Sequence, residues 1–372
     1  MAEDKDKKSK KLEPPRLFRQ RTTNTDVTFV ESQQIGLDVG ISGGRGIPLG
    51  DFITVWAPPG SGKTTIIGDA IRRIIARHKR MGIPFKAMYI DIEGSKDLLL
   101  SMGLGEYIES GDLIYTYGET VTYADLAETY DSILQGEENM KDVRLIVVDS
   151  ITSVTTEDRE ARGVEDADYG IIAKAAKAFY RKYVPKCKEK LTTFMINQVA
   201  CNQDATNPHS PKIKNASGEA AKHYSSIIAF LAKKTSKQDK DTKEVDVQTT
   251  FGVKKRQPKF IVTLKTVNES YKLKNRFGDI PDVDILVDRG VGAVNAFTLR
   301  EMLAGQGFIT GSGYYSLSKE LPVEVPDKKL PLKELNKFIS ANMEALITWM
   351  KETGRYKALL GDIKNDDDED GF

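Results

Sequence analysis

Residues 52–65 read Phe52-Ile53-Thr54-Val55-Trp56-Ala57-Pro58-Pro59-Gly60-Ser61-Gly62-Lys63-Thr64-Thr65, an apolar run followed at once by a glycine-rich loop. The apolar run predicts a buried strand, and the residues after Lys63 have the pattern of a helix. Gly60 and Gly62 lack a Cβ, so the backbone N–H groups of the loop can turn inward. The helix that follows adds unsatisfied N–H groups and a dipole that favour an anion. This order of strand, loop and helix predicts a phosphate-binding site.

The loop predicts a nucleotide as the ligand. Lys63 would place a positive charge against the β- and γ-phosphates, and the hydroxyl of Thr64 would bind Mg²⁺. The pattern usually begins with glycine, and Ala57 is a tolerated variant. The alternative is a chance glycine-rich turn, which the strand before it and the helix after it argue against. The expected cofactors are ATP and Mg²⁺, and the expected contacts are Pro59, Gly60, Ser61, Gly62, Lys63, Thr64 and Thr65.

Composition restricts the class of protein without naming a partner. The chain has 372 residues, 40% of them hydrophobic, which suffices for a sizeable core and for two or three domains. The net charge of +1 and the two cysteines exclude a strongly charged protein and a disulfide framework. No apolar run approaches the roughly 18 residues of a membrane span, and the N-terminus has no signal-peptide pattern. We therefore expect a soluble intracellular protein with no membrane partner.

Apolar periodicity alternates between helix and strand along the chain. After the loop, apolar residues at positions 67, 70, 71, 74 and 75 form one face of a helix. Apolar runs at 86–93, 143–150 and 192–198 predict buried strands, with helices expected at 123–134 and 168–188. Such alternation implies right-handed crossovers. The predicted fold class is α/β, a mostly parallel twisted sheet flanked by helices.

Three polar residues come at the ends of these predicted strands. Because ligands of parallel sheets bind at the carboxyl ends of the strands, Glu93, Asp149 and Gln198 would meet the loop there. Asp149 could accept from Thr64 or from a water on Mg²⁺; the alternative is an acid that caps the next segment. Glu93 could orient and activate the water that attacks the γ-phosphate. The amide of Gln198 could bind a γ-phosphate oxygen and relay its presence to the irregular segment that follows.

The order and spacing of these motifs resemble the RecA-type recombinases, and among them the phage UvsX-like strand-exchange proteins. The resemblance extends from about Val30 to Leu317. It rests on the lead-in at 34–50, the loop at 57–65, the strands at 89–94 and 145–150, Asn197-Gln198, and the segment 217–226. It implies a RecA-like P-loop ATPase core with a short N-terminal arm and a small helical C-terminal region.

The resemblance also implies roles within the ATP site. Lys63, Thr64 and the loop backbone would hold ATP, with Thr64 and Asp149 on the Mg²⁺ ion. Glu93 would be the catalytic carboxylate. Gln198 would couple the γ-phosphate to a DNA-binding loop.

A second catalytic element is implied by the resemblance at Lys274 and Arg276. These residues match a Lys-x-Lys/Arg element that reaches the ATP of a neighbouring subunit. Two cations across an interface would neutralise charge that develops on the γ-phosphate. On sequence alone, a solvated basic turn would be the better interpretation of both residues.

Two loops, near 155–170 and 200–218, are expected to bind DNA. In the first loop acids outnumber Arg159 and Arg162, so only these arginines are expected to contact phosphates. In the second, Lys212, Lys214 and backbone amides would contact phosphates, and Lys222 follows just beyond it. No aromatic side chain of the second loop could stack on bases. A polar insertion at 233–259 is expected to form a surface hairpin, a candidate secondary site for duplex DNA.

Charge and composition divide the chain into four expected segments. Residues 1–26 form a basic arm that we expect to be disordered. Residues 27–320 form the ATPase core, and residues 321–361 form a helical C-terminal region that begins with a Pro-rich linker at 322–331. Residues 362–372 contain five consecutive carboxylates, an acidic tail. That tail either increases solubility or competes electrostatically with DNA for the basic surface.

The predicted protein is a DNA-dependent ATPase of homologous recombination that forms filaments on single-stranded DNA and catalyses homologous pairing and strand exchange. Its expected partners are single-stranded DNA, homologous duplex DNA and further copies of itself, with ATP at the subunit interface. A single-strand-binding protein and a loading mediator are further candidate partners. The resemblance implies the bacterial cytoplasm or nucleoid, including during phage infection.

Two other functions remain open. The first is a hexameric helicase or branch-migration ATPase with a RecA fold, of the RadA or DnaB type. Against it, the sequence shows neither zinc-ribbon cysteines nor a separate helicase N-terminal domain. The second is a non-catalytic recombination mediator, against which the intact Lys63, Thr64, Glu93 and Asp149 argue.

Overall fold

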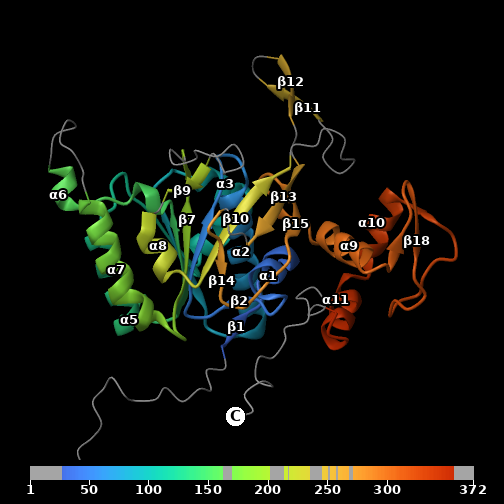
Figure 1. The fold of residues 1–372 in the computed structure, drawn as a ribbon, viewed down its shortest axis with the longest axis horizontal. Coiled ribbons are helices and arrows are strands. Elements are labelled where there is room, and N and C mark those ends of the chain that lie inside the picture. Colours follow the sequence, from blue (N-terminus) through green and yellow to red (C-terminus); the bar gives the residue numbers. More distant parts are fainter. Residues whose placement is uncertain are drawn as a thin grey trace, which may run out of the picture.

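The protein folds around one twisted central sheet with helices on both faces, as a computed structural model shows (Figure 1). The structure describes residues 27–161, 170–201, 213–216, 218–234, 245–249, 252–256, 259–267 and 271–355. The basic arm, the acidic tail and the middle parts of both expected DNA-binding loops lie outside these residues. Their predicted properties therefore stay predictions.

The central sheet has ten strands, and most of it is parallel. Its order is β16 (Gly292–Ala293), β15 (Val283–Asp288), β13 (Lys259–Lys265), β10 (Ile227–Lys233), β3 (Phe52–Trp56), β7 (Thr192–Asn197), β6 (Val143–Asp149), β4 (Lys86–Asp91) and β5 (Leu113–Tyr117), while β14 (Lys274–Asn275) pairs with β10. Pairing is parallel from β10 through to β5, and antiparallel at β13, β14, β15 and β16. The predicted α/β class with a mostly parallel sheet is confirmed.

One face of the sheet is covered by α1 (Ile35–Ser42), α2 (Lys63–Met81) and α9 (Asn295–Gly305). The apolar face predicted for α2 is confirmed, because Ile67, Ala70, Ile71, Ile74 and Ile75 are all buried in this core. The helix ends at Gly82, whose positive φ of 65° and N–H bonds to two carbonyls of the last turn close it. The start of α2 is therefore held against the sheet, at the phosphate-binding loop.

The other face is covered by α5 (Tyr123–Gln135), α7 (Ile171–Cys187) and α8 (Gly218–Tyr224). Its core is rich in aromatic rings, with Tyr130 and Phe179 edge to face at 5.1 Å between centroids. The buried hydroxyl of Tyr130 shares a 2.8 Å hydrogen bond with Thr193 on β7, so the ring is both packed and satisfied. Both layers thus fix the strands whose ends carry the polar residues.

The remaining elements connect the layers or extend them. Short helices are η2 (Ile151–Ser153), α3 (Lys96–Ser101), α4 (Gly105–Glu109) and α6 (Glu157–Glu160). Short strands form β1 (Phe29–Val30) with β2 (Ile47–Pro48), β8 (Val199–Cys201) with β9 (Ile213–Asn215), and β17 (Ile309–Thr310) with β18 (Tyr314–Leu317) and β19 (Leu330–Pro331). The insertion expected to be a hairpin contains the antiparallel pair β11 (Val245–Thr249) and β12 (Gly252–Arg256).

The C-terminal helices α10 (Leu332–Ala341) and α11 (Met343–Glu352) pack on the first core. Their buried residues include Leu335, Ile339 and Leu346. The segment 322–331 differs from the expected linker, because Val323 and Val325 pack against the same core. Within the described ranges, no helix is both long and apolar enough to span a bilayer.

The three strands predicted at 86–93, 143–150 and 192–198 all end earlier than expected, and the second of them ends at Asp149. The strand expected at 86–93 ends at Asp91, and the one expected at 192–198 ends at Asn197. Asp91 ends its strand because its carboxylate accepts the backbone N–H groups of Glu93 and Gly94, at 3.1 and 2.9 Å, and so turns the chain. Glu93 therefore lies in a turn rather than in a strand.

Asp38 gives the fold a measurable pH dependence. Its buried carboxylate accepts from the N–H and the hydroxyl of Ser32, and burial raises its pKa from 3.8 to about 7. The folded state thus holds a proton that the unfolded state releases, so this contribution to stability is lost as pH rises from about 4 to about 7. We expect Asp38→Asn to raise the free energy of unfolding at pH 8 by on the order of 2–4 kcal/mol.

Urea unfolding of the full chain at pH 5 and pH 8 measures this effect. The gain from Asp38→Asn should be much smaller at pH 5, where wild-type Asp38 is protonated. Asp327→Asn, at an exposed carboxylate, is the matched control and should change neither value. An equal gain at both pH values would contradict the prediction.

Candidate nucleotide-binding site

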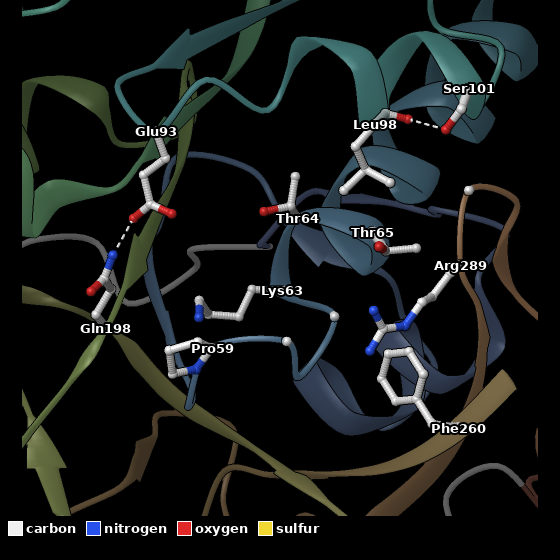
Figure 2. A pocket seen from close by; sticks show the side chains of 13 residues that line it. Pro59, Lys63, Thr64, Thr65, Glu93, Leu98, Ser101, Gln198, Phe260 and Arg289 are labelled. Atoms are coloured by element: carbon white, nitrogen blue, oxygen red, sulfur yellow. Dashed lines mark hydrogen bonds between the residues drawn. The ribbon is translucent and has the colours of Figure 1, made fainter. Parts of the chain in front are cut away.

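A pocket of about 580 Å³ opens at the carboxyl ends of the parallel strands (Figure 2). Most of the residues predicted to bind and hydrolyse ATP line it together. They are Pro59, Gly60, Gly62, Lys63, Thr64, Thr65, Glu93 and Gln198. Ser61 is buried within the loop itself. The parallel sheet therefore brings residues of distant segments to one place, as the sequence predicts.

The phosphate-binding loop has the backbone form that its glycines predict. Gly60 and Gly62 have positive φ angles of 70° and 82°. A Cβ on Gly62 would lie 3.1 Å from the ring of Phe260, so the loop also packs tightly on β13. Lys63 is largely buried and donates from Nζ to the carbonyl of Ala57 at 3.0 Å. Burial lowers the pKa of Lys63, an effect that the carboxylates of Asp149 and Glu93 oppose.

Thr64 and Asp149 meet at the base of the loop. The Thr64 hydroxyl donates to Oδ2 of Asp149 at 2.8 Å, one of the two contacts expected from the sequence. The buried hydroxyl of Tyr89 donates to the same oxygen at 2.6 Å. Burial raises the pKa of Asp149 to about 6, and these two hydrogen bonds act in the opposite direction.

The donor set suits Mg²⁺. Oδ1 of Asp149 is buried and has no hydrogen-bond partner among the described residues, so an oxygen lone pair is available beside the Thr64 hydroxyl. In the same part of the chain, no group of three His, Cys, Asp or Glu side chains could hold a metal alone. Mg²⁺ needs no such cage, because it commonly takes one or two protein oxygens plus water and phosphates.

Asp91 fixes the turn that carries Glu93. Besides the N–H groups of Glu93 and Gly94, it accepts the N–H of Ser95 and the hydroxyl of Tyr115, each at 2.6 Å. Asp91 is fully buried, so these donors compensate its loss of water. Glu93 itself is exposed to the pocket, and its position follows from the Asp91 turn.

Gln198 joins Glu93 to the stem of the second expected DNA-binding loop. Its Nε2 donates to Oε1 of Glu93 at 2.6 Å (Figure 2). Its carbonyl accepts the N–H of Ala216 at 3.2 Å, at the end of the β8–β9 ribbon. One residue earlier, the Asn197 amide donates to Oδ1 of Asn215 in the same ribbon. The stem is thereby attached directly to the pocket.

Lys274 and Arg276 do not lie in this pocket. Arg276 forms a 2.9 Å ion pair with the buried Asp51, which comes immediately before β3, whereas the phosphate-binding loop follows β3. The five residues of β3 separate Asp51 from the start of the phosphate-binding loop by about 16 Å. Burial raises the pKa of Asp51 to about 6, and Arg276 opposes this shift. Lys274 donates to the carbonyl of His223 at 3.4 Å.

Three of the expected DNA contacts fall on described elements. Arg159 lies in α6, Lys214 in β9 and Lys222 in α8. Arg162 and Lys212 lie outside the described residues. The expected helix at 168–188 begins at Ile171, directly after the first loop.

Sequence reasoning missed several residues of the site. Phe260 and Arg289 enter the pocket from β13 and from the turn after β15, and Leu98 and Ser101 enter from α3. Tyr89 reaches Asp149 because β4 and β6 pair in parallel with Tyr89 opposite Val147 and Asp91 opposite Asp149. The alternation of side chains along β4 could have indicated Tyr89, whereas no local pattern marks Arg289.

The chain is similar to known proteins along most of its length. A family model described as the RecA N-terminal domain matches residues 13–271. Protein RecA of a Nitratiruptor species is 24% identical over 309 residues, which cover 81% of this chain and 83% of that protein. Protein RecA of Campylobacter jejuni subsp. doylei is 26% identical over 301 residues, covering 80% and 83%. Protein RecA of Wolinella succinogenes is 29% identical over 202 residues, covering 54% and 53%.

The Tyr89 hydroxyl provides a test of the Mg²⁺ site. Tyr89→Phe removes one donor to Asp149 while keeping the ring, so the carboxylate loses orientation and its pKa rises further. We expect about a tenfold loss of Mg²⁺-dependent ATP affinity, in the range found for partners of metal ligands. Calorimetric titration with and without Mg²⁺ measures it. Tyr115→Phe removes a donor to Asp91 instead and should keep the Mg²⁺ dependence; wild-type affinity in Tyr89→Phe would contradict the assignment.

Proposed function

Because the chain belongs to the RecA family, we propose that it is a recombinase that binds ATP and Mg²⁺, assembles on single-stranded DNA and exchanges strands with a homologous duplex. It acts in the bacterial cytoplasm, and ATP hydrolysis depends on DNA. Residues 27–320 form its ATPase core, between a basic arm at 1–26 and a helical region at 321–361 that leads to an acidic tail.

Hydrolysis uses the residues of the pocket in distinct roles. The loop amides and Lys63 bind the phosphates, while Thr64 and Asp149 hold Mg²⁺, which neutralises charge on the phosphate oxygens. Glu93 accepts a proton from water as the water oxygen bonds to the γ-phosphorus. The bond between that phosphorus and the β–γ bridging oxygen breaks, giving ADP and phosphate.

The hydrogen bond between Gln198 and Glu93 is the observation that carries the proposal. It connects the group that activates water with the ribbon that leads into the second loop. A γ-phosphate oxygen would compete for the Gln198 amide, so ATP and ADP would leave the ribbon in different positions. A nucleotide-dependent DNA loop is what a recombinase requires and what a mere ATP-binding scaffold does not.

The location of Lys274 and Arg276 supports an assembly in which each pocket is completed by a neighbour. Arg276 pairs with Asp51 at the end of β3 opposite to the pocket, Lys274 lies level with the middle of β3, and neither residue lines its own pocket. In a head-to-tail contact they would face the next subunit's γ-phosphate as paired cations. Single-stranded DNA, duplex DNA and copies of the chain are the partners; a single-strand-binding protein and a loading mediator would assist.

Hydrolysis with and without single-stranded DNA tests the function. Wild type should be strongly stimulated by DNA. Lys63→Ala should lose at least about 100-fold in rate, as expected for removal of a charge from the developing transition state. Gln198→Ala should keep nucleotide binding and lose the stimulation, because the pocket and the loop stem are disconnected.

Four other outcomes would contradict the proposed function or favour an alternative to it. A wild-type hydrolysis rate that is the same with and without DNA would contradict the assignment as a recombinase. Unwinding of a duplex without strand exchange would favour the hexameric helicase. Failure of wild type to hydrolyse ATP with DNA present would favour a non-catalytic mediator. Full DNA stimulation of Gln198→Ala would contradict the proposed coupling route.

Mixing two inactive variants tests the shared pocket. Lys274→Ala keeps a complete phosphate-binding loop but lacks one of the two cations, and Lys63→Ala keeps both cations but lacks the lysine of the loop. Each variant alone should therefore be nearly inactive. An equal mixture should regain hydrolysis wherever the pocket of the first faces the cations of the second. A mixture no more active than its components would show that Lys274 does not act on a neighbour's nucleotide.

A further inference from the structure

The pocket extends well beyond the phosphate-binding loop. Figure 2 shows Glu93 and Gln198 on one side of Lys63 and Thr64, and Leu98, Ser101 and Arg289 on the other. The γ-phosphate must lie toward Glu93, where water is activated. The sugar and base of a nucleotide bound by this loop therefore extend toward α3 and Arg289.

Arg289 is held in that part of the pocket by an aromatic ring. Its guanidinium carbon lies 5.1 Å from the centroid of Phe260, a distance typical of a cation–π contact. Phe260 is 3% exposed and packs beneath Gly62, so the ring is a fixed support. Figure 2 shows the guanidinium above this ring and turned into the pocket, with Leu98 across from it.

In the described part of the chain, no carboxylate forms an ion pair with Arg289. The carboxylate of its neighbour Asp288 pairs with Lys259 instead, at 3.4 Å. The guanidinium is thus an available planar cation beside an apolar side chain. A guanidinium stacks on aromatic faces and is only weakly hydrated, so it loses little when a flat ring covers it. An ammonium group has no plane with which to do the same.

We propose that Arg289 binds the nucleobase. Its guanidinium has the ring of Phe260 on one side and stacks on the purine, in the pocket, with the other. This inference rests on the proposed ATP site and adds to it a residue that sets nucleotide affinity. Because Arg289 lies far from the γ-phosphate side, it contributes equally to ATP and ADP and leaves the chemical step unchanged. Stacking on a π face is also tolerant of the base, so other purine nucleotides gain similarly.

Binding by the full-length chain tests the proposal with three probes: ATP, ADP and inorganic tripolyphosphate. Arg289→Gln should weaken ATP and ADP by the same factor, about 5- to 30-fold, the range for a stacked guanidinium. It should leave tripolyphosphate binding unchanged. Arg289→Lys should recover little of the loss. Arg144→Gln, at an exposed arginine in the second position of β6 and so at the opposite ends of the strands, is the matched control and should bind all three probes normally.

The outcomes separate this inference from the ATP site itself. If wild type binds nucleotide and Lys63→Ala does not, the ATP site stands; Arg289→Gln behaving like Arg144→Gln would then overturn the inference alone. Weaker tripolyphosphate binding by Arg289→Gln would assign Arg289 to the phosphates and overturn base stacking, as would full recovery in Arg289→Lys. A wild-type chain that binds no probe would overturn both proposals.

Discussion

The register of the parallel strands is the constraint on which the site depends. Asp91 lies opposite Asp149, Asp149 opposite Ile196, and Trp56 opposite Asn197. All four strands thus end at nearly the same level, and the loops that follow them meet. Because side chains alternate along a strand, a slip of one residue in β6 would turn Asp149 to the other face and away from Thr64. The two buried cores resist such a slip, since it would move every apolar side chain of β6 into the core on the opposite face, where it lacks its packing partners.

Buried acids at this edge differ in what satisfies them, and the difference suits their roles. Asp91 has backbone and hydroxyl donors on both oxygens and acts as a fixed support for a turn. Asp149 has donors from the described residues on one oxygen only, so its other oxygen remains open to a ligand. A group with every lone pair used can position a neighbour, whereas a group with one left open can also bind.

The sequence predicted the parts of this protein that depend on local pattern. The strand, loop and helix at 52–81, the parallel sheet and the meeting of Glu93, Asp149 and Gln198 all follow from apolar periodicity and from the geometry of parallel sheets. What it could not predict arises from tertiary contacts. Nothing near Arg276 indicates its ion pair with Asp51, and Phe260 reaches the loop only because β13 lies beside β10. The Pro-rich segment at 322–331 resembles a linker in composition, yet its valines find apolar partners once the core exists.

Strand β3 carries unlike chemistry at its two ends, a phosphate-binding loop after Trp56 and the Asp51–Arg276 ion pair before Phe52. In the head-to-tail assembly that we propose, contacts between unlike ends generate a directional polymer wherever the rotation between subunits does not close a ring. One terminal subunit then has a pocket without a neighbour's cations, and the other has cations without a pocket to serve. The two ends of such a polymer would hold nucleotide for different times, so gain and loss of subunits would be unequal at the two ends. A single buried strand would in this way give the whole assembly its direction.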